Sequence, residues 1–112
     1  MNAPENPWIE ICPGIKRRTL TTGTNMYQML AQLDAGSRMP EHHHAQEQIA
    51  HVLSGRIRML VAGVAHELKT GDSIYLGSDE LHGVETLEET TMLDTFSPPR
   101  DDYLAKDASA KS

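Results

Sequence analysis

Cysteine, aromatic residues and long apolar runs are all scarce in this sequence of 112 residues. The single cysteine, Cys12, has no partner within the chain, so a disulfide framework is excluded and a reducing compartment is indicated. No apolar run approaches the roughly 20 residues of a membrane-spanning helix, so no membrane partner is expected. The first residues carry neither a basic leader nor the apolar core of a secretory signal. We therefore expect a cytoplasmic protein.

Positively charged residues are also fewer than negatively charged ones. Lysine and arginine number 10 against 16 aspartates and glutamates, which gives a formal net charge of −6. A nucleic-acid partner is not expected, because such partners require a basic surface. The length suits one domain, and 38% hydrophobic residues suffice for one modest core. We predict a single domain over residues 1–112.

Glycine and proline occur throughout and divide the chain into short segments. These segments are too short for ordinary helices but suit strands of about four to eight residues. Within residues 56–61, Ile57, Met59 and Val61 share one parity while two arginines take the other, which is typical of a strand with one wet face. The sequence therefore favours β-structure over helix.

Further strands are predicted on both sides of that segment. A hairpin at Ala62-Gly63 would lead into a strand over 64–69, and strands are also expected at 73–76 and 90–96. Many short strands with closely spaced turns are typical of an all-β sandwich or barrel. Residues 101–112 form a polar tail that is either a short helix or without fixed structure.

The most distinctive feature is a run of three histidines at positions 42–44. Residues two apart in a strand share a face, with Cα atoms about 6.5–7 Å apart. His42 and His44 could therefore converge on one cation, whereas His43 would point to the other face. His51 and His66 are more simply partly exposed strand residues than ligands. A solvated strand end remains the alternative for the triplet alone.

The residues around the triplet follow a recognisable pattern. Gly36, five residues, His42-x-His44, three residues, Gln48, six residues and Gly55 are followed by Gly71-DSIYL-Gly77-SDEL-His82. In this order and spacing the two segments resemble the two motifs of the cupin superfamily. The resemblance covers roughly residues 25–100 and implies a single cupin domain, a small jelly-roll β-barrel. It departs from the family at Gly77 and Leu81, where prolines are usual.

By this resemblance, one divalent metal would be held by four residues: His42, His44, Gln48 and His82. Counting forward from His44 and back from Gly55 both select position 48, so Glu47 is out of register. Three imidazoles and an amide leave the charge of the ion uncompensated, which favours an anionic ligand and modestly favours Lewis-acid chemistry over oxygen chemistry. Zinc, nickel, iron, cobalt and manganese all suit these ligands.

A third segment, M92-L-D94-T-F96-S-P-P-R100, points to one group within the superfamily. This segment is similar to the corresponding segment of the KdgF-type pectin-degradation cupins, which open the ring of 4,5-unsaturated uronate monosaccharides. The resemblance implies catalytic roles for Asp94 and Arg100 and substrate contacts for Phe96 and Arg100. The substrate would be a small anionic sugar, and small cupins of this kind commonly form homodimers.

These roles make chemical sense from the residues themselves. Asp94 and Phe96 share a strand parity with Met92, so both could face the barrel interior. A carboxylate there can act as general base on a hemiacetal hydroxyl, and Arg100 can hold the uronate carboxylate by two hydrogen bonds. The structural alternatives are an edge-strand acid for Asp94, a surface charge for Arg100 and, as the favoured role, core packing for Phe96.

Three other functions stay open. A cupin dioxygenase acting on a small enol or thiol would need redox-active iron or copper. A non-catalytic cupin would use the metal only to anchor a sugar or effector. A metal-free sugar epimerase is disfavoured, because four ligand positions would then be filled without purpose.

Overall fold

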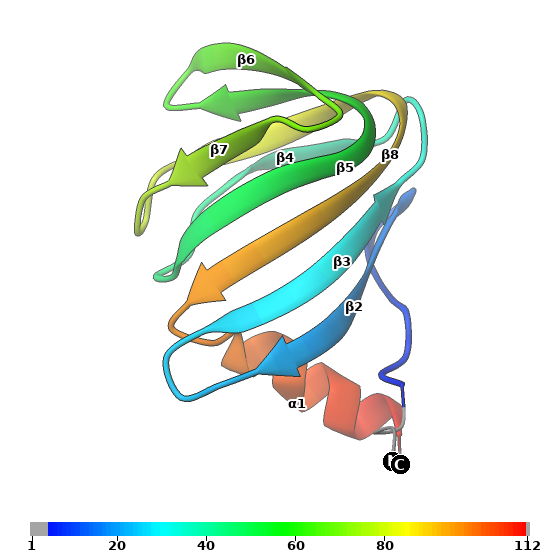
Figure 1. The fold of residues 1–112 in the computed structure, drawn as a ribbon, viewed down its shortest axis with the longest axis vertical. Helices are drawn as coiled ribbons and strands as arrows, with labels where there is room; N and C mark the ends of the chain where they lie inside the picture. The colour runs from blue at the N-terminus through cyan, green and yellow to red at the C-terminus, as the bar shows by residue number, and fades with distance from the viewer. Residues whose placement is uncertain (1–4, 112) are drawn as a thin grey trace.

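The computed structural model describes residues 5–111. Over this range the chain folds into strands followed by one C-terminal helix (Figure 1). The elements are β1 (Ile9–Cys12), β2 (Ile15–Thr22), β3 (Tyr27–Leu33), β4 (Arg38–His42), β5 (Glu47–Val61), β6 (Val64–Lys69), β7 (Ser73–Leu76), β8 (His82–Ser97) and α1 (Asp101–Ala110). The predicted all-β class is confirmed.

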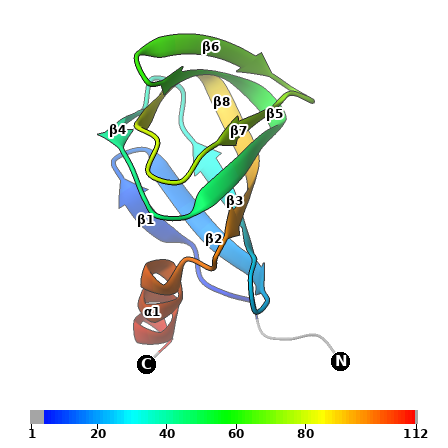
Figure 2. The same ribbon diagram turned by 90° about the vertical axis from the view of Figure 1, so that its left-hand side faces the viewer.

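All strands belong to one antiparallel sheet. Its order is β1-β2-β3-β8-β5-β6, and β4 pairs with β8 while β7 pairs with β5. The two long strands, β5 with 15 residues and β8 with 16, pair along most of their length. Both strands bend, and the sheet curls around a common interior that Figure 2 shows end-on. The result is the small barrel that the sequence motifs predict.

Gly55 lies at the bend of β5. The register between β5 and β8 shifts on both sides of it, between Val52 and Ile57. The φ angle of Gly55 is +107°, and an added Cβ would lie 2.4 Å from both the Glu89 carbonyl oxygen and Thr90 Oγ1. A side chain here would therefore meet strained backbone and a steric clash together. The last glycine of the first motif lets the sheet close.

The sequence pattern of the middle strands is confirmed. Ile57 and Met59 are buried, and the alternate arginines of β5 are at least partly exposed. The hairpin at 62–63 is confirmed as well, since Val61 pairs with Val64 across it. The strand predicted at 90–96 is only the second half of β8, whose first half pairs with β4. The longer strand allows β8 to line both halves of the barrel.

Two apolar clusters fill the interior. The larger occupies the middle of the barrel, and the smaller consists of Tyr27, Met29 and Phe96 beneath α1. The helix adds Tyr103 and Leu104 to this smaller cluster. Among residues 5–111, no helix is long and apolar enough to cross a membrane.

Helix α1 is fixed to β2 by a buried ion pair. Arg17 is 0% exposed and Asp107 4% exposed, and Arg17 Nη1 lies 2.7 Å from Asp107 Oδ1. Thr19 Oγ1 donates to the other carboxylate oxygen at 2.6 Å, and Arg17 Nη2 donates to the Tyr103 carbonyl at 3.1 Å. A buried pair of this kind is costly to break, because one charge would be left unpaired. The tail that the sequence left unassigned is therefore a docked helix.

Candidate metal centre and adjoining cavity

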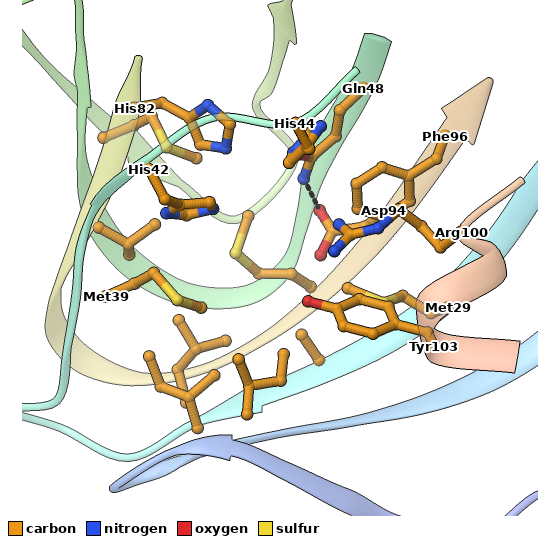
Figure 3. A pocket seen from close by; sticks show the side chains of 17 residues that line it. Met29, Met39, His42, His44, Gln48, His82, Asp94, Phe96, Arg100 and Tyr103 are labelled. Atoms are coloured by element: carbon orange, nitrogen blue, oxygen red, sulfur yellow. Dashed lines mark hydrogen bonds between the residues drawn. The ribbon is translucent and has the colours of Figure 1, made fainter. Parts of the chain in front are cut away.

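Three histidines from two neighbouring strands and the loop between β4 and β5 meet at one end of the barrel (Figure 3). His42 ends β4 and pairs with His82, the first residue of β8, while His44 follows β4 in the loop. One ring nitrogen from each of the three lies within 4.8 Å of the others. The three side chains could therefore hold a metal ion.

The route to this arrangement differs from the prediction in one respect. The strand expected to run through the triplet ends at His42, so His44 reaches the cluster from a loop. His43 nevertheless lies outside the cluster, as predicted: its side chain is 63% exposed and its Nδ1 is 3.5 Å from Asp79 Oδ1. The loop turns the chain so that the side chains of His42 and His44 still point toward the same cluster.

The hydrogen bonds of the three rings fix their proton positions. In each ring, Nδ1 lies 2.8–2.9 Å from a backbone carbonyl oxygen two residues away. A carbonyl oxygen only accepts hydrogen bonds, so in the neutral form of each ring Nδ1 carries the proton and Nε2 keeps its lone pair. Backbone partners of this kind orient the imidazole ligands of metal sites.

Burial also favours the neutral form of two of the three rings. It lowers the pKa of His82 to about 4, and it lowers the pKa of His44, where the charge of Arg100 acts in the same direction. Metal binding requires the unprotonated imidazole. Around neutral pH these two rings are thus already in the form that binds an ion.

Gln48 on β5 brings a side-chain oxygen atom to the edge of the histidine cluster. Its side chain is buried, its Oε1 lies 3.2 Å from His44 Nε2, and its Nε2 donates to Asp94 Oδ1 at 3.1 Å. This orientation points two lone-pair atoms, Oε1 and the histidine Nε2, at the same space. A cation between them would satisfy both, so the donor set fits a divalent ion. Glu47 is exposed and accepts a hydrogen bond from the Tyr75 hydroxyl instead.

Asp94 and Phe96 face the interior from β8, as their shared parity predicts. They are 5% and 1% exposed. Burial raises the pKa of Asp94 to about 7, against the opposing effects of the Gln48 hydrogen bond and the Arg100 charge. Phe96 fills the smaller core cluster and also lies edge-on to His44, with ring centroids 5.4 Å apart. Phe96 thus packs in the core, as favoured from the sequence, and also forms part of the cavity wall.

Arg100 sits at the N-cap of α1 and is buried. Its guanidinium carbon lies 4.9 Å from the Phe96 ring centroid and 3.9 Å from that of Tyr103. Its Nε and Nη2 donate to Asp102 at 3.1 and 2.9 Å. One edge of the guanidinium is therefore occupied, and a carboxylate ligand would have to use the Nη1 side.

These groups line one cavity with two unlike ends (Figure 3). The polar end holds the histidine cluster together with Gln48, Asp94, Arg100 and Tyr103, whereas the other end is apolar. Four of the six methionines line the cavity: Met29, Met39, Met59 and Met92. His51 and His66 do not line this cavity, as expected.

Among the polar residues that line the cavity, Tyr103 is the one that the sequence did not single out. It belongs to the polar tail, where two adjacent apolar residues, Tyr103 and Leu104, gave no helical periodicity. The spacing Arg100-x-x-Tyr103 was the available signal, because residues three apart on a helix share a face.

Comparison with known proteins agrees with this architecture. The family model described as the cupin domain matches residues 29–96. The pectin degradation protein KdgF of Dickeya dadantii (strain 3937) is 37% identical over 102 residues, which cover 89% of this chain and 93% of that protein.

Two solved structures are also similar. KdgF from Halomonas sp. superposes with a TM-score of 0.82 at 28% identity, covering 87% of this chain and 90% of its own. An RmlC-like cupin from Shewanella frigidimarina NCIMB 400 has the same TM-score and identity, with 88% of each chain covered. On its sequence, fold and histidine cluster, this chain belongs to the cupin family.

Proposed function

We propose that this protein catalyses the metal-dependent ring opening of a 4,5-unsaturated uronate monosaccharide. The observation that carries the proposal is the cavity in which Asp94 and Arg100 lie beside the histidine cluster. The relative from Dickeya dadantii is named for pectin degradation, which supports a uronate as the substrate class.

The proposed ligands of the metal are His42, His44, His82 and Gln48. The two lone-pair atoms that face each other across 3.2 Å, Gln48 Oε1 and His44 Nε2, support this set. When bound, a divalent ion would stabilise negative charge that develops on the oxygen atoms of the substrate. All four ligands are neutral, so an anionic sugar would complete the charge balance.

Asp94 is the proposed general base. Its carboxylate would take the proton of the hemiacetal hydroxyl, the C1–O5 bond would break, and the ring oxygen would leave as an enolate. Return of the proton to C4 gives the linear keto form, so the step is an isomerisation with no net change in atoms. The Gln48 hydrogen bond supports this role, because it holds Asp94 beside the proposed ligands.

Arg100 and Phe96 are proposed to hold the sugar. The Nη1 side of the Arg100 guanidinium is available for the uronate carboxylate, since Asp102 occupies the other edge. The Phe96 ring offers an apolar surface next to His44 for the face of the sugar ring. Both contacts would orient the reacting end of the substrate toward Asp94.

The test follows the conjugated alkene of the cyclic substrate, which absorbs in the near ultraviolet and is lost on opening and tautomerisation. Metal-loaded protein is added to unsaturated monosaccharides prepared by lyase digestion of polygalacturonate and of alginate. We expect the decay of absorbance to accelerate without oxygen or nucleotide, and metal-stripped protein to lose the effect. His43→Ala serves as the matched control, because His43 lies outside the cluster.

The outcomes separate the alternatives. Oxygen consumption coupled to substrate loss would indicate a dioxygenase. Uronate binding with an unchanged absorbance decay would indicate a non-catalytic sugar-binding cupin. A decay unaltered by the wild-type protein, across substrates from both polymers, would contradict the proposal.

A further inference from the structure

Tyr103 places a hydroxyl group in the cavity beside the proposed substrate-binding arginine. It is the third residue of α1, is half-buried and lines the cavity. In Figure 3 its ring extends from the helix into the cavity below Asp94 and Arg100, with the hydroxyl at the far end. Core packing requires only the ring. The hydroxyl oxygen accepts a hydrogen bond from the Arg100 guanidinium, which leaves its own hydrogen free to donate.

The ring is held between two cations. The Arg17 guanidinium carbon lies 4.3 Å from its centroid, and that of Arg100 lies 3.9 Å from it. Each arginine has its own acid, Asp107 for Arg17 and Asp102 for Arg100. Stacking of this kind fixes the plane of the ring. The position of the hydroxyl is therefore set before any ligand enters.

The backbone at Tyr103 is fixed as well. Its carbonyl oxygen accepts a hydrogen bond from Arg17 Nη2 at 3.1 Å, and Arg17 is itself anchored on Asp107 at 2.7 Å. A donor held this firmly loses little conformational entropy when a ligand binds. The arrangement is that of a preorganised binding group.

The chemistry of the hydroxyl complements that of Arg100. Burial raises the pKa of Tyr103, so the phenol is neutral and can donate a hydrogen bond. Arg100 uses two of its five N–H groups on Asp102, and the remaining ones can bind a carboxylate from the Nη1 side. A carboxylate offers about four lone-pair sites, so it can accept a further hydrogen bond from a second donor on the same side of the cavity.

We propose that Tyr103 is a further substrate-binding residue, whose hydroxyl donates a hydrogen bond to the carboxylate that Arg100 binds. This inference rests on the function proposed above. It extends the binding site for the acid group from one residue to two, both carried by the start of α1. Helix α1 is then part of the site and not only a cover of the smaller core cluster.

The test is Tyr103→Phe in the full-length, metal-loaded protein, since this change keeps the ring between its two arginines. From the strength of a hydrogen bond to a charged group, we expect KM for the unsaturated uronate to rise about 10- to 100-fold. The kcat should change little, because the lost contact is made in ground and transition states alike. Tyr75→Phe, which removes an exposed hydroxyl outside the cavity, is the matched control and should leave both constants unchanged.

An unchanged KM in Tyr103→Phe would overturn the inference while leaving the proposed function standing. A fall in kcat at constant KM, together with a lower melting temperature, would assign Tyr103 a structural role and overturn it too. If the wild-type protein opens no unsaturated uronate, calorimetry with galacturonate decides separately. Weaker binding to Tyr103→Phe than to wild type supports the carboxylate contact, and equal or absent binding contradicts it.

Discussion

Gln48 Nε2 donates a hydrogen bond to Asp94 Oδ1 over 3.1 Å, while Gln48 Oε1 lies 3.2 Å from His44 Nε2. One amide thus connects a proposed metal ligand with the proposed base. A glutamate at this position has no N–H to donate and would set two carboxylates against each other. The amide N–H therefore serves the neighbouring Asp94, while the amide oxygen faces the histidine cluster.

This connection predicts the effect of Gln48→Glu. Two carboxylates about 3 Å apart cannot both ionise, so the pKa of Asp94 should rise further and Asp94 should hold its proton at neutral pH. We expect the metal to be retained and the ring-opening rate to fall at least about tenfold, since the base would be blocked. The ring-opening rate is measured by the decay of absorbance, and metal content by elemental analysis. Glu47→Gln, at an exposed position, is the control. A fully active Gln48→Glu protein would contradict the role assigned to the amide.

The identity of the fourth ligand gives a second prediction. Gln48→Ala should weaken metal retention more than Glu47→Ala does, because Gln48 faces the cluster while Glu47 bonds the Tyr75 hydroxyl outside the cavity. Dialysis against a chelator, followed by elemental analysis, measures the difference. The opposite order would place the fourth ligand at Glu47.

The histidine cluster gives a third prediction. His42→Ala, His44→Ala and His82→Ala should each largely remove one divalent ion per chain, since each deletes one of three converging ring nitrogens. His43→Ala should retain the ion. Full occupancy in the His82 variant, or a wild-type protein without metal after loading, would contradict the assignment.

The sequence could predict this cluster because the motif spacing selects the histidines that meet, even where the secondary structure is misjudged. The triplet was expected in a strand, yet His44 lies in a loop and still reaches the other two histidines. The count to Gly55 likewise selected Gln48 over Glu47, and in the structure Gln48 Oε1 faces His44 while Glu47 is exposed.

The C-terminal helix could not be predicted in the same way. A helix is usually recognised by an apolar face, but α1 has only Tyr103 and Leu104 on the core and is anchored by Asp107. The partner of Asp107 is Arg17, which lies 90 residues earlier in the chain. From the sequence alone, an acid in a polar tail is expected to be solvated, because its distant partner is visible only in the fold. Since the helix was not predicted, the position of Tyr103 beside the cavity was not predicted either.

Gly55→Ala tests the closure of the barrel. The substitution meets both a φ of +107° and contacts of 2.4 Å to backbone and side-chain atoms of β8. Gly63→Ala is a matched control, because Gly63 has a φ of +82° with nothing near its Cβ position. We expect Gly63→Ala to lower the free energy of unfolding by about 1–2 kcal/mol and Gly55→Ala by at least about 3 kcal/mol, since a steric clash adds to the strain. Urea unfolding measures both, and equal losses would contradict the close approach.

Asp94→Asn tests the proposed base most directly. Asparagine keeps the shape of the side chain, and its Oδ1 can still accept the hydrogen bond from Gln48 that Asp94 accepts now. Metal content and stability should therefore stay near wild type. The rate of ring opening should fall by roughly 10²–10⁴, the usual contribution of a positioned general base. Asp34→Asn, at an exposed acid that does not line the cavity, is the matched control.

Two measurements decide how a result with Asp94→Asn is interpreted. Metal analysis shows whether the ligand set survived, and KM shows whether the substrate still binds beside Arg100. A large fall in kcat with metal and KM unchanged is expected only if the carboxylate itself takes the proton. Activity that survives in Asp94→Asn with full metal content would show that Asp94 is not the general base. The burial that raises the pKa of Asp94 to about 7 would then be a consequence of packing alone.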